Sequence, residues 1–147
     1  MGEVALMNPD ELARRVAEEM LSGEGTGPAW AIKIDEVRSG YARLSMVVRG
    51  DMLNSHAIAH GGMIFSLADT AFAYVCNGGN EATVAAQASI IFLDKAMEGE
   101  TLVAEAQQVA REGRAGVTRV SVRTKDGRNI AEFTGYSRTL GGAVVAI

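Results

Sequence analysis

Residues 60–69 read HGGMIFSLAD, and this stretch decides which fold and site we expect. Two glycines open a nearly apolar run that predicts a helix over residues 62–77. Between Gly61 and Gly79 the only charged side chain is that of Asp69. A helix that is apolar on nearly all sides is surrounded by protein, and a carboxylate buried there costs several kcal/mol unless something compensates it. Asp69 therefore meets solvent or a partner, or it takes part in chemistry.

The glycines before this helix supply a second feature of an active site, which is a set of free backbone N–H groups. The first N–H groups of a helix have no partner within the helix, and they lie at the positive end of its dipole. A carboxylate and an anion-binding helix end, two turns apart on one element, predict an active site.

The sequence before the central helix predicts one further helix and two strands. Asn8 is a helix cap followed by proline and two acids, and it predicts a helix over residues 9–21. Alternating apolar residues predict strands over residues 30–37 and 41–48, joined by a turn at Ser39-Gly40.

The sequence after the central helix predicts four more strands, over residues 83–93, 101–111, 116–124 and 129–140. Their short connections favour an antiparallel meander. We therefore predict an α+β fold in which one antiparallel sheet wraps around one long helix. The whole chain, 1–147, is expected to form a single domain, with residues 1–28 as its N-terminal helix and loop. Such a sheet has an exposed edge, which favours pairing with a second copy.

Composition excludes several classes of protein. Hydrophobic residues make up 48% of the 147 residues, enough for one packed domain. The net charge of −4 and the pI of about 5.2 argue against a nucleic-acid partner. The single cysteine, Cys76, favours a reducing compartment. No signal peptide is recognisable, and the apolar run 63–75 is shorter than the roughly 20 residues that span a bilayer. We expect a cytoplasmic protein with no membrane partner.

Three segments resemble the hotdog-fold acyl-CoA thioesterases of the phenylacetate-degradation (PaaI) type. They are NSHAIAHGG at residues 54–62, LADTAFA at residues 67–73, and Cys76-Asn77, and the resemblance covers about residues 29–140. It implies the hotdog fold and the hydrolysis of aryl- or acyl-CoA thioesters, often of hydroxylated phenylacetyl-CoA. It also implies a homotetramer built as a dimer of dimers, with each active site between two protomers.

The resemblance assigns roles to four residues of the expected catalytic site. Asp69 matches the carboxylate that acts as nucleophile or as general base on water. Gly61 matches the glycine whose backbone N–H polarises the thioester carbonyl, a donor typically worth about 10²–10³ in rate. His60 and Asn54 match polar residues that position the thioester or its loop. No metal and no cofactor are expected, because a thioester is already activated and coenzyme A enters only as part of the substrate.

Further residues are candidates for substrate binding. They are Gly62, Phe65, Gln87, Ser89 and Arg114. Gln87 or Ser89 stands in the region where many relatives place a serine or threonine facing the catalytic carboxylate. Met63 and Phe72 are, with Phe65, candidates for the acyl-pocket wall. The basic residues of the later turns are candidates for the coenzyme A phosphates; they are Arg111, Arg114, Lys125 and Arg128.

Several alternatives stay open at this point. His56 and His60 stand four residues apart, as in some metal sites, but the glycines after them interrupt a regular helix. Cys76 is expected to be a packed thiol rather than a nucleophile. Asp94-Lys95 replaces the basic residue and proline of many relatives. A hotdog hydratase or dehydratase, or a non-enzymatic acyl-CoA binding protein, is the alternative function.

Overall fold

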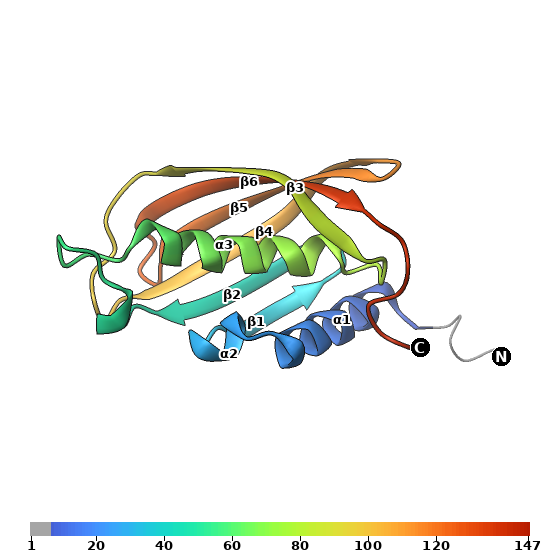
Figure 1. Ribbon diagram of the computed structural model, residues 1–147, viewed down its shortest axis with the longest axis horizontal. Helices are drawn as coiled ribbons and strands as arrows, with labels where there is room; N and C mark the ends of the chain where they lie inside the picture. The colour runs from blue at the N-terminus through green and yellow to red at the C-terminus, as the bar shows by residue number, and fades with distance from the viewer. Residues whose placement is uncertain (1–6) are drawn as a thin grey trace.

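The computed structural model describes residues 7–147 as an antiparallel six-stranded sheet that curves around one helix (Figure 1). The elements are α1 (Pro9–Gly23), α2 (Thr26–Ala29), β1 (Lys33–Arg38), β2 (Tyr41–Val47), the 3-10 turn η2 (Gly50–Met52), α3 (Gly61–Cys76), β3 (Thr83–Phe92), β4 (Thr101–Glu112), β5 (Ala115–Thr124) and β6 (Asn129–Thr139). The strand order is β1-β2-β4-β5-β6-β3. The predicted fold class, a sheet around a long central helix, is confirmed.

The first helix begins where the sequence predicts. The Asn8 side chain accepts a 2.8 Å hydrogen bond from the backbone N–H of Asp10, which is the expected N-cap. The buried face of α1 consists of Ala13, Val16 and Ala17 and packs against β1 and α3. The short helix α2, which follows it, was not predicted.

The β1–β2 hairpin has the predicted turn at Ser39-Gly40, where Gly40 adopts a φ of +76°. Strand β1 begins at Lys33, three residues later than expected. Ala31 has a φ of +53°, and the N–H of Ile32 bonds to the carbonyl of Gly27 at 3.0 Å. Residues 30–32 therefore form the turn that ends α2, although their apolar alternation predicts the start of a strand.

The predicted meander is correct for β4, β5 and β6 and wrong for β3. Strand β3 pairs with β6 at the far edge of the sheet, with Ile90 opposite Phe133. The physical reason is that α3 carries the chain across the sheet between β2 and β3, so residues 93–100 must return to the middle (Figure 1). The outer edge of β3 has no strand partner within residues 7–147.

The core lies between α3 and the inner face of the sheet. Phe72 is 1% exposed and its ring packs beside that of Phe133, with centroids 5.8 Å apart. Gly135 of β6 makes room for the helix, because a Cβ atom there would lie 2.6 Å from the Phe72 ring. Among residues 7–147, no helix is long and apolar enough to cross a membrane.

Candidate active site

The N-terminus of α3 presents two hydrogen-bond donors. His60 is the N-cap, and its Nδ1 accepts a 2.9 Å hydrogen bond from the N–H of Gly62. Because Nδ1 is an acceptor, the neutral ring carries its proton on Nε2, on an exposed side chain. The N–H of Gly61 has no hydrogen-bond partner within residues 7–147. This helix end can therefore donate to an oxygen of a ligand.

Asn54 holds the loop that leads into α3. Its Oδ1 accepts hydrogen bonds from the N–H groups of His56 at 2.9 Å and Ile58 at 3.4 Å. The loop closes through an isolated bridge between Leu53 and Ala59. Asn54 thus orders the turn that places His60, and His56 contributes its backbone to that turn.

A hollow of about 350 Å³ lies beside Gly61. Its lining brings together two of the predicted site residues, Asn54 and Gly61, with residues that sequence analysis did not assign to the site. The complete lining is Asn54, Ile58, Ala59, Gly61, Ile64, Phe92, Leu93, Asp94 and Lys95. Phe92 was missed because a strand-ending aromatic residue reads as core until its neighbours in space are known.

Asp69 lies half-buried on α3, and no hydrogen bond or ion pair to it occurs within residues 7–147. Burial raises the pKa of its carboxyl group above the ordinary value of 3.8. Asp69 follows Gly61 by eight residues on one helix, which corresponds to roughly 12 Å at the usual rise of 1.5 Å per residue. The carboxylate and the free N–H of one chain are therefore too far apart to act on the same carbonyl group.

The thiol of Cys76 is a packed group, as expected. Burial is the main cause that raises its pKa to about 12, and the charge of Asp69 acts in the same direction. Its Sγ donates to the carbonyl of Ala73 at 3.6 Å. A thiol held protonated in this way is a poor nucleophile.

Three residues were predicted to form the wall of the acyl pocket. The prediction is wrong for Phe72, because this side chain is buried under the sheet within its own chain. Phe65 is half-buried and meets Phe133 edge-on, with centroids 5.3 Å apart. Met63 is also half-buried. Phe65 and Met63 therefore keep a free surface, and Phe72 does not.

The position of Gln87 and Ser89 is a second correction. They pair with Tyr136 and Thr134, whereas Ala88 pairs with Gly135, which packs against α3. Side chains of directly opposite residues share one face of a sheet. Gln87 and Ser89 therefore point away from α3, and neither faces Asp69 of its own chain.

A bulge causes this difference. The register of β3 shifts between Ala85 and Gln87, so one extra residue changes which side chains face inward. Beyond the bulge, Ala85 pairs with the buried Ser137. The inner face of β3 thus presents alanines beside the helix.

The four basic residues that were candidates for the coenzyme A phosphates do not lie together. Their positions in the later turns of the sequence suggested a cluster, and the structure separates them. Arg111 forms an ion pair with Glu81 at 3.4 Å near the C-terminal end of α3. Arg128 lies at the other end, where it pairs with Asp94 at 3.0 Å and Glu100 at 2.9 Å. Both guanidinium groups are thus engaged within the chain.

Arg114 and Lys125 are exposed and form no ion pair within residues 7–147. The carbonyl of Arg114 accepts a hydrogen bond from Thr139, which lines a cavity together with Cys76 at the end of α3. Arg114 is therefore remote from Gly61 of the same protomer, and a joint role in one chain is not supported.

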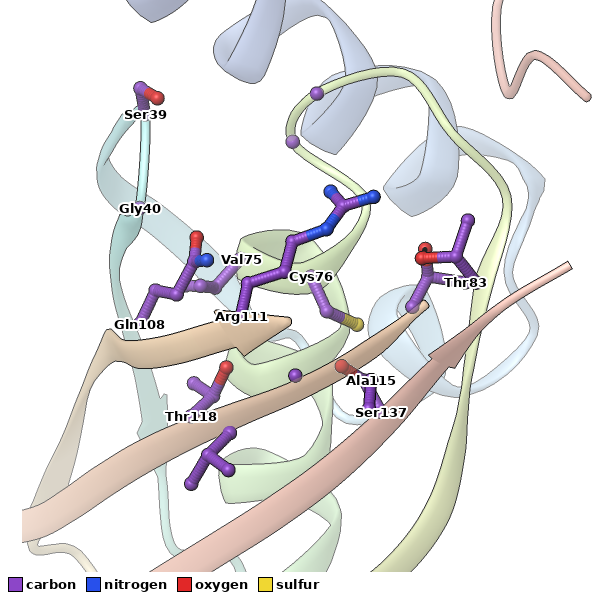
Figure 2. A pocket seen from close by; sticks show the side chains of 15 residues that line it. Ser39, Gly40, Val75, Cys76, Thr83, Gln108, Arg111, Ala115, Thr118 and Ser137 are labelled. Carbon is purple, nitrogen blue, oxygen red and sulfur yellow. Dashed lines mark hydrogen bonds between the residues drawn. The ribbon is translucent and has the colours of Figure 1, made fainter. Parts of the chain in front are cut away.

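That cavity, of about 180 Å³, is shown in Figure 2. Five of its fifteen lining residues carry hydroxyl groups, among them the buried Thr118 and Thr83, whose hydroxyl lies 3.2 Å from that of Thr139. The Cys76 thiol also points toward it, and Arg111 stands at its mouth (Figure 2). Neither Asp69 nor Gly61 lines this cavity, so it lacks the two groups expected to do the chemistry.

Comparisons with known proteins agree with this geometry. Residues 56–131 match the model of the thioesterase superfamily. The acyl-coenzyme A thioesterase PaaI of Escherichia coli is 38% identical over 128 residues, which cover 87% of this chain and 91% of that protein.

Solved structures give the same result. The structure of the E. coli PaaI protein, from the phenylacetic acid degradation operon, has a TM-score of 0.90 at 36% identity and covers 92% of this chain and 99% of its own. A hypothetical thioesterase protein of Streptococcus pneumoniae, solved with coenzyme A, has a TM-score of 0.74 at 25% identity and covers 76% of this chain and 90% of its own.

Proposed function

This chain belongs to the thioesterase superfamily and is an acyl-CoA thioesterase with the hotdog fold, and from that premise we propose that Asp69 and Gly61 carry the hydrolysis. In the overall reaction, the oxygen of water bonds to the carbonyl carbon of the thioester and the carbon–sulfur bond breaks. The sulfur leaves with a proton as free coenzyme A, and the acyl group leaves as the acid.

The observation that carries this proposal is the free carboxylate of Asp69 on the central helix. Its burial raises the pKa of the carboxyl group, and a stronger base accepts a proton from water more readily. Asp69 either removes a proton from the attacking water or attacks the carbonyl carbon itself. Incorporation of oxygen-18 from labelled water into Asp69 during a single turnover distinguishes the second route from the first.

Gly61 supplies the donor for the oxyanion that forms as the carbonyl group is attacked. Its N–H is free and lies at the positive end of a 16-residue helix. A fixed donor of this kind stabilises the transition state more than the ground state. His60, on the preceding residue, has its Nδ1 engaged by the N–H of Gly62, which leaves its Nε2–H to hold the thioester or its carbonyl oxygen beside that donor.

We assign each active site to two protomers. The free carboxylate and the free donor of one chain lie roughly 12 Å apart along α3. The unpaired edge of β3 exposes Val84 and Ile91, at 46% and 66% of their surfaces. An exposed apolar edge strand favours pairing with another strand, and a second copy paired there would bring its own α3 close. Two such dimers would form the expected tetramer.

The substrate we propose is an aryl-CoA of the phenylacetyl type. The similarity to the E. coli PaaI thioesterase, which comes from a phenylacetic acid degradation operon, supports this class. The nucleotide phosphates would meet Arg114 or Lys125, whose charges are free within residues 7–147. We expect no metal or cofactor, with coenzyme A as part of the substrate only, and we keep the cytoplasm as the expected location.

Substitution of Asp69 tests this function. Asp69→Asn keeps the size of the side chain but removes the base, so we expect thiol release from phenylacetyl-CoA to fall by about 10²–10⁴. The matched control is Asp35→Asn, an exposed carboxylate of β1 bonded to Ser45 at 3.1 Å, which should keep wild-type turnover. Near-wild-type turnover in Asp69→Asn would refute the assignment, provided that the variant retains the wild-type circular dichroism spectrum.

A further inference from the structure

Phe92, the last residue of β3, lies against the first residue of α3. A Cβ atom built on Gly61 would be 3.0 Å from the Cζ of Phe92 and 3.5 Å from its Cε1 and Cε2. The tip of the ring therefore lies so close that a Cβ atom at position 61 would require the ring to shift by a few tenths of an ångström. The other half of the ring is free, since Phe92 is 50% exposed and lines the 350 Å³ hollow beside Gly61.

This contact explains why position 61 holds a glycine. Gly61 is not among the glycines with positive φ, so its backbone conformation is open to any residue. The start of the helix does not require glycine either. At the first helical position, other residues have a helix propensity at least as high as that of glycine. The close approach of Phe92 is the requirement that the structure shows.

The segment that carries Phe92 is held firmly on both sides. The N–H of Leu93 bonds to the carbonyl of Ile130 at 2.8 Å. Arg128 binds the carbonyl of Lys95 at 2.9 Å as well as the carboxylate of Asp94 at 3.0 Å. Asp94, which departs from the sequence of many relatives, is thus neutralised within the chain. These contacts hold the backbone that follows Phe92, and so they limit how far its ring can move from Gly61.

We propose that Phe92 is a positioning residue for the hydrolysis, acting through Gly61. Its ring fixes the first turn of α3 and excludes water from one side of the donor. A hydrogen bond to a developing negative charge is stronger when less water surrounds it. The donor also needs no reorganisation during the reaction if its position is already fixed. This inference rests on the proposed role of Gly61.

The first test compares Phe92→Ala and Phe92→Leu with Val109→Ala in the thiol-release assay. We expect Phe92→Ala to lower kcat by about tenfold, less than the loss of a whole donor, with a smaller change in KM. Phe92→Leu refills the space and should recover most of kcat. Val109 is 57% exposed on β4, away from Gly61 and from the edge of β3, so Val109→Ala should keep wild-type kcat.

A double-mutant cycle supplies a readout that general destabilisation would not move. Gly61→Ala keeps the N–H but places a methyl group against the ring, so we expect kcat to fall by about tenfold in the wild-type background and by about twofold or less in Phe92→Ala. Melting temperatures of the same four proteins are measured in parallel. The effects of the two substitutions on the melting temperature should be additive, apart from the small effect of packing one methyl group.

The outcomes separate this inference from the proposed function. Wild-type kcat in Phe92→Ala, or additive effects of the two substitutions on kcat, would overturn the positioning role even if Asp69→Asn is inactive. Full turnover in Asp69→Asn would instead refute the proposed function. If Phe92→Ala does not fold, the same double-mutant cycle is measured with Gly61→Ala and Phe92→Leu. Leucine is smaller than phenylalanine and leaves more space beside position 61, so Gly61→Ala should lower kcat less in Phe92→Leu than in the wild-type background.

Discussion

The carboxyl group of Asp69 has no hydrogen-bond or ion-pair partner within residues 7–147, and burial raises its pKa above 3.8. The native state therefore binds a proton at Asp69 more tightly than the unfolded chain does. By linkage, the free energy of unfolding falls as pH rises from the unfolded-state pKa through the raised native pKa. At neutral pH the charged side chain thus destabilises the fold that it serves.

Asp69→Asn should therefore stabilise the protein while it abolishes turnover. We expect a gain of about 1 kcal/mol near neutral pH, which raises the melting temperature by about 2–4 °C in a domain of this size. The gain should shrink below pH 3.8, where the carboxyl group is protonated in both states. Thermal unfolding of both proteins across this pH range measures it, and a variant less stable than wild type at neutral pH would show that Asp69 has a stabilising partner.

At this scale, sequence analysis identified the residues with unusual chemistry but not their neighbours. Asp69 stands out because it is the only charge on an apolar helix, and Gly61 because it precedes that helix. Phe92 carries no such signal, because its contact with Gly61 spans 31 positions of the chain. Gln87 was a candidate to face Asp69, but a single bulge in β3, which the sequence does not reveal, reverses the alternation and turns its side chain away from α3.

The helix α3 fits against β6 through one close approach. Gly135 faces the ring of Phe72, and a Cβ atom at position 135 would lie 2.6 Å from that ring. Phe72 is fully buried beside Phe133 and has little room to move. The seating of α3, and with it the placement of Asp69, thus depends on a missing side chain in the sheet.

We predict that Gly135→Ala destabilises the protein by about 2–3 kcal/mol, because a closely packed core does not accept an added methyl group. The control is Gly79→Ala, where a Cβ atom meets nothing within 4 Å and φ is not positive. That substitution should change the free energy of unfolding by less than about 0.5 kcal/mol. Urea denaturation of both variants checks this prediction, and equal effects at the two positions would contradict it.

The elements themselves follow from local sequence, and their arrangement follows only in part. Most predicted boundaries lie within two residues of the observed ones, as with α3 at Gly61–Cys76 instead of 62–77. Alternation identified β3 as a strand but carries no information on which strand it joins. Its position next to β6 depends on the path of α3 across the sheet, which no local pattern encodes.

In the part of the chain that the structure describes, the two proposed catalytic groups lie at separate places on one helix, and the outer edge of β3 has no strand partner. A monomer built in this way holds half of each of two sites. We therefore expect turnover to require the dimer, with Asp69 of one protomer acting on a thioester held at the Gly61 N–H of its partner.

Complementation between two inactive variants tests that claim most directly. Asp69→Asn removes the base, and Gly61→Pro removes the donor N–H. Position 61 is the first residue of α3, where the helix backbone accepts proline, and the added Cβ atom meets the Phe92 ring as it does in Gly61→Ala. Protomers of the two kinds, carrying different affinity tags, are exchanged and the mixed dimer is isolated through both tags. One of its sites then combines an intact Asp69 with an intact Gly61, and the other has neither.

We expect this mixed dimer to recover about half of the wild-type turnover, because one of its two symmetry-related sites is intact. Each parent homodimer should stay inactive in the same thiol-release assay. If the mixed dimer is no more active than its parents, both groups act within one chain, and the shared site is refuted.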